Sequence, residues 1–157
     1  TPKPLNENLF KNAELNSDGV WETTIYGGAE GDSKIENGTA IFHLTKLGTD
    51  DWAPQFKQVD LQIEQGCTYR LSMNVNSTIA RDIIFKVQQN GGSYTTYLQE
   101  TKALSVGDNN INIEFTMKSA SDARALFCAA MGAQKISDEH TLTFSNMSLV
   151  KIAEAIN

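Results

Sequence analysis

The acidic, nucleophilic and basic side chains of this chain lack the spacing that catalysis requires. Glu64, Asp82 and Glu114 stand alone rather than as the paired acid and base of a glycosidase, and they fit solvated surface positions. The chain has no GxSxG turn to expose a nucleophilic serine and no glycine-rich loop to hold a phosphate. His43 and His140 form no HExxH pair. These patterns favour binding over catalysis.

The two cysteines, Cys67 and Cys128, lack the CxxC or Cys/His spacing of a zinc site. They can form one disulfide if the protein is exported. The simpler interpretation is that both are free and act as small buried apolar side chains. The sequence leaves both alternatives open.

Length and charge limit the classes of partner. The chain has 157 residues, enough for one domain with its own core. Its 13 Lys and Arg against 19 Asp and Glu give a net charge of −6, which disfavours phosphate binding. No apolar run approaches the roughly 20 residues of a membrane helix. We expect a soluble chain with no nucleic acid or membrane partner, and any export signal to be removed or to lie upstream.

Apolar and polar residues alternate along much of the chain, which is typical of strands with one buried face. The alternation is clearest at 68–75 and 110–117. Weaker candidates are 40–44, 55–63, 79–87, 95–99, 123–131 and 141–150, and the alanines of 123–130 also suit a short helix. Turn-forming residues separate these segments at 26–28, 37–38, 64–66, 90–92 and 107–110. The pattern predicts an all-β fold, an antiparallel β-sandwich.

The two ends of the chain differ from its middle. Two of the three prolines lie within residues 1–4, which favours an extended linker. Residues 153–157 follow the last strand-like segment and predict a linker or tail. The domain is therefore expected at 5–152, as a module of a larger protein.

Three motifs occur in a fixed order: WAPQF at 52–56, LQIEQGCTYRLS at 61–72 and QNGGSY at 89–94. NAE at 12–14, Trp21 and FSNMSL at 144–149 extend the pattern to both ends. Together they resemble the carbohydrate-binding modules of families 4 and 9, which are attached to secreted bacterial cellulases, xylanases and laminarinases. The resemblance implies a jelly-roll sandwich that binds a glycan chain along one sheet.

The resemblance also points to aromatic residues that could stack on sugar rings. Trp52 and Tyr94 stand where the family places cleft aromatics, although Trp52 could instead be a core residue at a strand start. Tyr26, in a glycine-rich loop, is a weaker candidate for a second wall. We expect Trp21 and Tyr69 in the core.

Strand alternation supplies candidate polar contacts. If Phe56 faces the core, then Gln55 and Lys57 face outward, and the same alternation turns Lys86 and Gln88 outward from an adjacent strand. Amides both donate to and accept from sugar hydroxyls. The predicted polar contacts are Gln55, Gln88 and Asn90, with Lys57 and Lys86 as flanking cations. Asn90 has an alternative role as a turn former before glycine.

The chain departs from the family at two places. The family's structural calcium is held by carboxylates at positions that correspond here to Asn16 and Ser145, which leaves Glu14 as a candidate ligand. Calcium prefers several carboxylate oxygens, so we expect a weakened site. Ala130 replaces an amide or imidazole, which predicts fewer hydrogen bonds on one side of the cleft.

The expected function is that of a non-catalytic, monomeric, secreted bacterial module. It would bind β-glucan or xylan in a groove and keep an attached glycoside hydrolase near its polysaccharide. The alternatives are a small jelly-roll glycanase or lyase, and an adhesion domain that binds protein through the same sheet. The curvature of the groove selects the sugar and its linkage, and that curvature follows from the tertiary structure rather than from the sequence pattern.

Overall fold

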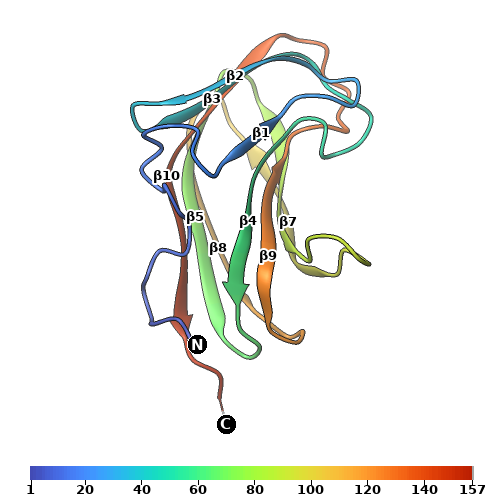
Figure 1. Ribbon diagram of the computed structural model, residues 1–157. Helices are drawn as coiled ribbons and strands as arrows, with labels where there is room; N and C mark the ends of the chain where they lie inside the picture. Colours follow the sequence, from blue (N-terminus) through green and yellow to red (C-terminus); the bar gives the residue numbers. More distant parts are fainter. Residues whose placement is uncertain (157) are drawn as a thin grey trace.

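The computed structural model describes residues 1–156; Asn157, the last residue of the predicted tail, lies outside them. These residues form two antiparallel five-stranded sheets packed face to face, without a helix (Figure 1). One sheet has the order β1 (Glu22–Thr24), β4 (Gln55–Ile63), β9 (Asp122–Ala130), β6 (Arg81–Gln88) and β7 (Thr96–Leu104). The other has the order β2 (Glu30–Glu36), β3 (Thr39–Lys46), β10 (His140–Ala153), β5 (Thr68–Ser77) and β8 (Gly107–Thr116). The predicted antiparallel sandwich of the jelly-roll type is confirmed.

The core lies between the sheets and is built from the apolar half of each alternating strand. β5 and β8 pair along their whole lengths, and Tyr69 and Leu71 of β5 are fully buried. Trp21 stacks on Phe56 with ring centroids 4.6 Å apart and is also buried. The predicted core positions of Trp21 and Tyr69 are therefore confirmed.

β9 has no alternation because both of its faces are buried. It lies in the middle of its sheet, between β4 and β6. Ala125 and Phe127 enter the main core, whereas Leu126 and Cys128 form a second apolar cluster on the outer face. A strand covered on both faces reads as a continuous apolar run. The alternative of a short helix at 123–130 is therefore wrong.

Two strands and one turn differ from the sequence-based prediction. β1 and β2 are absent from it because β1 has three residues and β2 is an edge strand whose side chains are exposed or half-buried. Residues 107–110, expected as a turn, begin β8. The turn lies earlier because Asn109 Oδ1 accepts from the backbone N–H of Ser105, and Asn109 Nδ2 donates to the Ser105 carbonyl.

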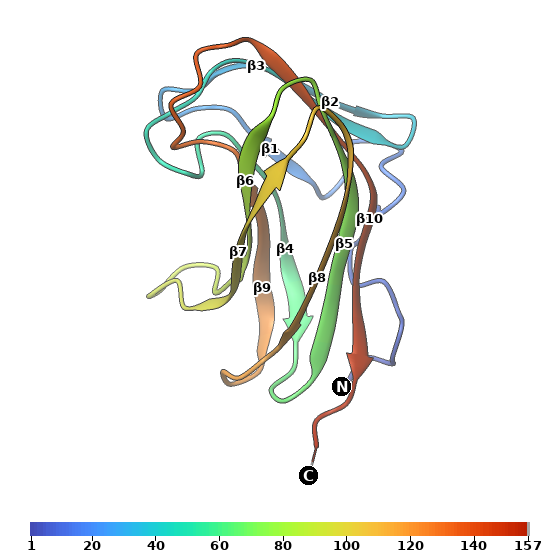
Figure 2. The same cartoon turned by 180° about the vertical axis from the view of Figure 1, so that it is seen from behind.

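Both ends of the described chain lie at the same end of the sandwich (Figures 1 and 2). Residues 1–4 form no strand, but Gln62 Nε2 on β4 donates to the Thr1 carbonyl at 2.7 Å. At the other end, β10 continues to Ala153. The domain limits 5–152 stay a prediction, and within residues 1–156 no helix could cross a membrane.

Cys67 and Cys128 are both free and buried. Cys67 belongs to the main core, whereas Cys128 lies in the cluster on the outer face of β9. The disulfide left open by the sequence is not formed, and the interpretation as small apolar side chains holds.

Candidate functional site

A cleft of about 520 Å³ lies over the outer face of β4, β9 and β6. Its lining residues are Tyr26, Trp52, Gln55, Lys57, Lys86, Gln88, Asn90, Tyr94 and Leu126. The structure therefore brings all eight residues selected from the sequence to one place and adds Leu126. Whether they contact a ligand stays a prediction.

The strand register explains why these side chains share a face. Lys57 on β4 pairs with Cys128 on β9, and Cys128 pairs with Lys86 on β6, so the three residues form one row across the sheet. Ala130 lies in the neighbouring row, between Gln55 and Ile84. β4 and β6 are thus separated by β9, and the expectation that Gln55 and Gln88 lie on adjacent strands is wrong.

The floor of the cleft is apolar. Leu126, Cys128 and Ala130 are buried there against the half-buried Val59 and Ile84. Ala130 was expected to remove hydrogen bonds from one side of the cleft, but it lies in the middle of the sheet. Because β9 is the central strand, Ala130 removes a polar side chain from the floor of the cleft rather than from one of its sides.

Trp52 and Tyr26 form one wall. Their ring centroids are 5.2 Å apart and the rings are tilted by 46°. Trp52 is half-buried, whereas Tyr26 is 56% exposed. A Cβ at Gly27, which has φ +68°, would lie 2.8 Å from two Trp52 ring carbons, so only glycine lets the indole ring lie here. Trp52 is therefore a wall residue with its back packed, not a core residue.

Backbone hydrogen bonds fix the loop that carries Trp52. The N–H of Gly48 donates to the Ala53 carbonyl at 2.8 Å, and the N–H of Gly132 donates to the Asp51 carbonyl at 2.8 Å. The N–H of Met131 donates to the Pro54 carbonyl at 2.9 Å. The wall is therefore held from behind by the segment that follows β9.

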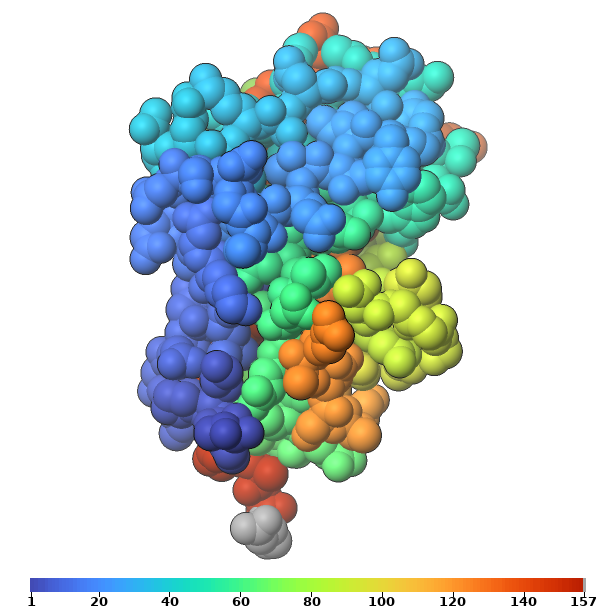
Figure 3. Space-filling view, in the orientation of Figure 1, coloured from blue at the N-terminus to red at the C-terminus, as the bar shows by residue number. Residues whose placement is uncertain are grey.

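Tyr94 and Asn90 lie on the opposite wall, in the loop between β6 and β7. Figure 3 shows this loop, in yellow-green, standing out beside the face of β9. Tyr94 is 56% exposed with φ +50°, and its N–H donates to the Gly91 carbonyl at 2.9 Å. Gln89 Oε1 accepts from Ser93 Oγ and from the N–H of Thr95, so the Gln89 side chain closes the loop from inside.

Gln55 faces the cleft but is only 8% exposed. Its Oε1 accepts from Cys128 Sγ at 3.1 Å. Burial raises the pKa of Cys128 to about 12, while the nearby ammonium groups of Lys86 and Lys57 act in the opposite direction. The thiol is therefore a neutral donor that orients the Gln55 amide. Gln88 is half-buried and more accessible.

The two cleft lysines differ in their partners. Lys86 Nζ lies 2.6 Å from Asp51 Oδ2, and the two side chains are 14% and 28% exposed. Lys57 Nζ lies 3.9 Å from Glu22 Oε1, beyond hydrogen-bond distance, and the two side chains are 21% and 50% exposed. Lys86 is thus closely neutralised, whereas Lys57 is not.

The candidate calcium ligands do not form a carboxylate cage. Glu14 borders a small hollow beside Asn8 and Asn146, and the Asn8 side chain already donates to the Met147 carbonyl and accepts from two backbone N–H groups. Asn16 borders a different hollow. Across residues 1–156, no three His, Cys, Asp or Glu side chains group closely enough to hold a metal ion. The residues present do not fit a calcium site built on several carboxylates.

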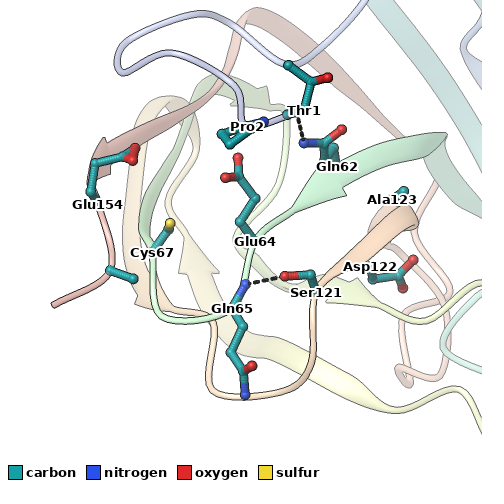
Figure 4. A pocket seen from close by; sticks show the side chains of 11 residues that line it. Thr1, Pro2, Gln62, Glu64, Gln65, Cys67, Ser121, Asp122, Ala123 and Glu154 are labelled. Atoms are coloured by element: carbon teal, nitrogen blue, oxygen red, sulfur yellow. Dashed lines mark hydrogen bonds between the residues drawn. The ribbon is translucent and has the colours of Figure 1, made fainter. Parts of the chain in front are cut away.

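A hollow of about 650 Å³ lies at the end of the sandwich near the chain termini (Figure 4). Among residues 1–156, no aromatic residue lines it. Its acidic Glu64 is already engaged: both carboxylate oxygens accept from Lys151 Nζ, at 3.3 and 3.2 Å, and one accepts from the N–H of Lys3. We therefore assign the candidate site to the smaller cleft, which combines exposed rings with polar groups.

The comparisons with known proteins identify the family and the fold. The family model of the carbohydrate-binding domain of families 4 and 9 matches residues 7–135. This chain belongs to that family. The family consists of non-catalytic carbohydrate-binding modules. A search of curated protein sequences gives no significant match.

Solved structures share the fold of this carbohydrate-binding module at low sequence identity. A CBM4 structure has a TM-score of 0.74 at 22% identity, with 94% of this chain and 99% of the other covered. The N-terminal cellulose-binding domain of Cellulomonas fimi β-1,4-glucanase C has a TM-score of 0.71 at 20% identity, covering 94% and 99%. The second N-terminal cellulose-binding domain of the same enzyme has a TM-score of 0.72 at 19% identity, covering 96% and 100%.

Sequence reasoning missed three residues that shape the cleft of this module. Asp51 is an ordinary loop acid until the fold brings it to Lys86, and Leu126 lies in a strand without alternation. Gln89 carries a local signal, because it precedes the Asn90-Gly91-Gly92 turn whose loop it closes. Only Gln89 could have been found from the sequence.

Proposed function

We propose that the cleft binds a single β-1,4-linked glucan or xylan chain and that the module carries this chain to an attached glycoside hydrolase. The observation that supports it is the pair of aromatic walls, Trp52 with Tyr26 on one side and Tyr94 on the other, with amides between them. Aromatic rings cover the apolar C–H faces of pyranoses, and amides pair with their hydroxyls. The cellulose-binding domains of Cellulomonas fimi share this fold, which favours a glucan.

The benefit to an enzyme would come from effective concentration. A module that holds the polysaccharide makes the encounter with a tethered catalytic domain intramolecular, and no bond needs to break in the cleft. A protein of this kind acts outside the cell, where polysaccharides are found. The proposal therefore includes secretion and attachment to a hydrolase.

Isothermal titration calorimetry with cello-, xylo- and laminari-oligosaccharides tests the proposal. We expect binding to at least one of the first two series, and a large loss in the Tyr94→Ala variant with its melting temperature retained. Tyr94 is exposed in the free protein, so its removal opens no cavity. Unchanged affinity in Tyr94→Ala would place the ligand elsewhere, and no binding to any glycan would favour a protein-binding domain.

A further inference from the structure

The charged side chains that line the cleft are opposite in sign to the net charge of the molecule. The chain carries a net charge of −6. Within residues 1–156, however, the only charged side chains that line the cleft are Lys57 and Lys86. Lys57 and Lys86 both pair with Cys128 in the row between them, so the two lysines flank the middle of the sheet face. An acidic protein thus presents cations at its candidate binding site.

Only one of these cations is available to a ligand. Lys86 is held by Asp51 at 2.6 Å, a short charge-assisted hydrogen bond. Lys57 has Glu22 as its nearest carboxylate, at 3.9 Å, and the Glu22 side chain is half exposed to water. The Lys57 side chain is itself only 21% exposed, so most of its stem is packed, and it lines the cleft without a carboxylate at hydrogen-bond distance from its ammonium group.

We propose that the cleft takes a glycan chain that carries a carboxylate, as in a uronic acid, and that Lys57 binds this group. The inference rests on the proposed function and adds the chemical class of the chain. The aromatic walls and the amides would hold the neutral sugar rings. Lys57 adds an ammonium group, which forms a stronger hydrogen bond with a carboxylate than with a neutral hydroxyl. A carboxylate at hydrogen-bond distance would give Lys57 the close partner that Glu22, at 3.9 Å, does not provide.

Calorimetry with matched pairs of oligosaccharides tests the proposal. One pair is a cello-oligosaccharide and its product oxidised at C6 to glucuronate. The other is a xylo-oligosaccharide bearing one glucuronic acid and its carboxyl-reduced form. At about 0.1 M salt, screening over roughly 10 Å suppresses repulsion from the acidic body more than it weakens a contact pair. We expect the acidic member of at least one pair to bind about tenfold more tightly.

Two variants assign the effect to the cleft. In Lys57→Gln the ratio of acidic to neutral affinity should fall to about one. Lys34→Gln is the matched control, because it removes the same charge from β2 of the other sheet, where the Lys34 side chain is 62% exposed. It should keep the wild-type ratio. Melting curves check that each variant is folded. The comparison of acidic and neutral oligosaccharides on the wild-type protein tests the inference even if a variant does not fold.

The outcomes separate this inference from the proposed function. Equal affinity for both members of each pair, or an acidic preference that survives in Lys57→Gln, overturns the inference and leaves the glycan-binding function in place. Failure of all four oligosaccharides to bind overturns both. A preference lost equally in Lys34→Gln would show an effect of net charge and also overturn the role of Lys57.

Discussion

Lys86 and Asp51 join the two sides of the cleft: Nζ of Lys86 on β6 lies 2.6 Å from Oδ2 of Asp51 in the loop before β4. Asp51 precedes Trp52, so the pair ties the loop that carries the aromatic wall to a strand two positions away in the sheet. The small Ala130 lies between β4 and β6 on the floor. We interpret Lys86 and Asp51 as positioning residues for Trp52.

Removing either partner of this pair should lower glycan affinity about tenfold, because the remaining charge is partly buried and the Trp52 loop loses its tie. Asp51→Asn keeps the shape of the side chain, and Lys86→Met keeps its stem. Titration calorimetry of both single variants and the double variant measures the coupling. The double variant should lose no more glycan affinity than the single variant that binds more weakly. Additive losses would instead show that each residue contacts the sugar independently.

Trp52→Ala should abolish or greatly weaken binding, and it should lower the free energy of unfolding less than the loss of a core tryptophan, because the half-buried indole ring forms a wall of the cleft. Trp21→Ala is the matched control. Trp21 is 4% exposed and stacks on Phe56, so its loss should cost about 3–5 kcal/mol of stability. Urea unfolding and calorimetry of both variants check this. A large stability loss in Trp52→Ala with affinity retained would contradict the assignment.

The two glutamines should respond differently to substitution. Gln88→Ala should fold normally and bind about threefold to tenfold more weakly, the loss expected for a neutral hydrogen bond. Gln55→Ala should lose stability as well, because Gln55 is nearly buried and accepts from Cys128 Sγ. Melting temperatures and binding constants distinguish the two. Intact affinity in both variants would remove the ligand from this sheet face.

The buried pair of Arg81 and His140 should make stability fall at acid pH. Arg81 Nη1 donates to His140 Nε2 at 2.8 Å, and burial lowers the pKa of Arg81 to about 10, so the guanidinium stays charged at neutral pH. Burial also lowers the pKa of His140. The charge of Arg81 lowers this pKa further, whereas the hydrogen bond to the Asp138 backbone raises it. The folded protein therefore binds this proton less readily than the unfolded chain.

The sign of the effect follows from that difference. His140 contributes stability above its unfolded pKa of about 6.5, and the contribution is lost as pH falls below it. His140→Gln keeps an acceptor for Arg81 but does not titrate. Melting temperatures measured from about pH 8 to pH 5 should fall more steeply in the wild type than in His140→Gln. His43→Gln, at the half-buried histidine of β3, serves as the control. Parallel curves for wild type and His140→Gln would refute the prediction.

Calcium should have little effect on stability, because within the described part of the chain Glu14 is the single carboxylate that lines its hollow. With a dissociation constant near 1 mM, millimolar calcium would add about 0.4 kcal/mol, or about 1 °C in the melting temperature. Melting curves with a chelator and with calcium measure this. A shift of many degrees would mean that backbone and amide oxygens build a full site.

The sequence by itself determines which side chains share the cleft face. Alternation along a strand has a fixed period of two, so Phe56 in the core places Gln55 and Lys57 outside, and Val87 does the same for Lys86 and Gln88. The motifs at 52–56 and 89–94 then indicate the loops that carry Trp52 and Tyr94. These are local properties, and each can be read within a few residues.

The tertiary structure decides how these faces are combined. Nothing local places β9 between β4 and β6, and that order turns Leu126, Cys128 and Ala130 into a floor. The contact between Asp51 and Lys86 joins residues 35 positions apart, and it exists only because the sheet order brings a loop over a distant strand. Such pairings depend on the packing of the whole chain, since no single segment carries the energy that selects them.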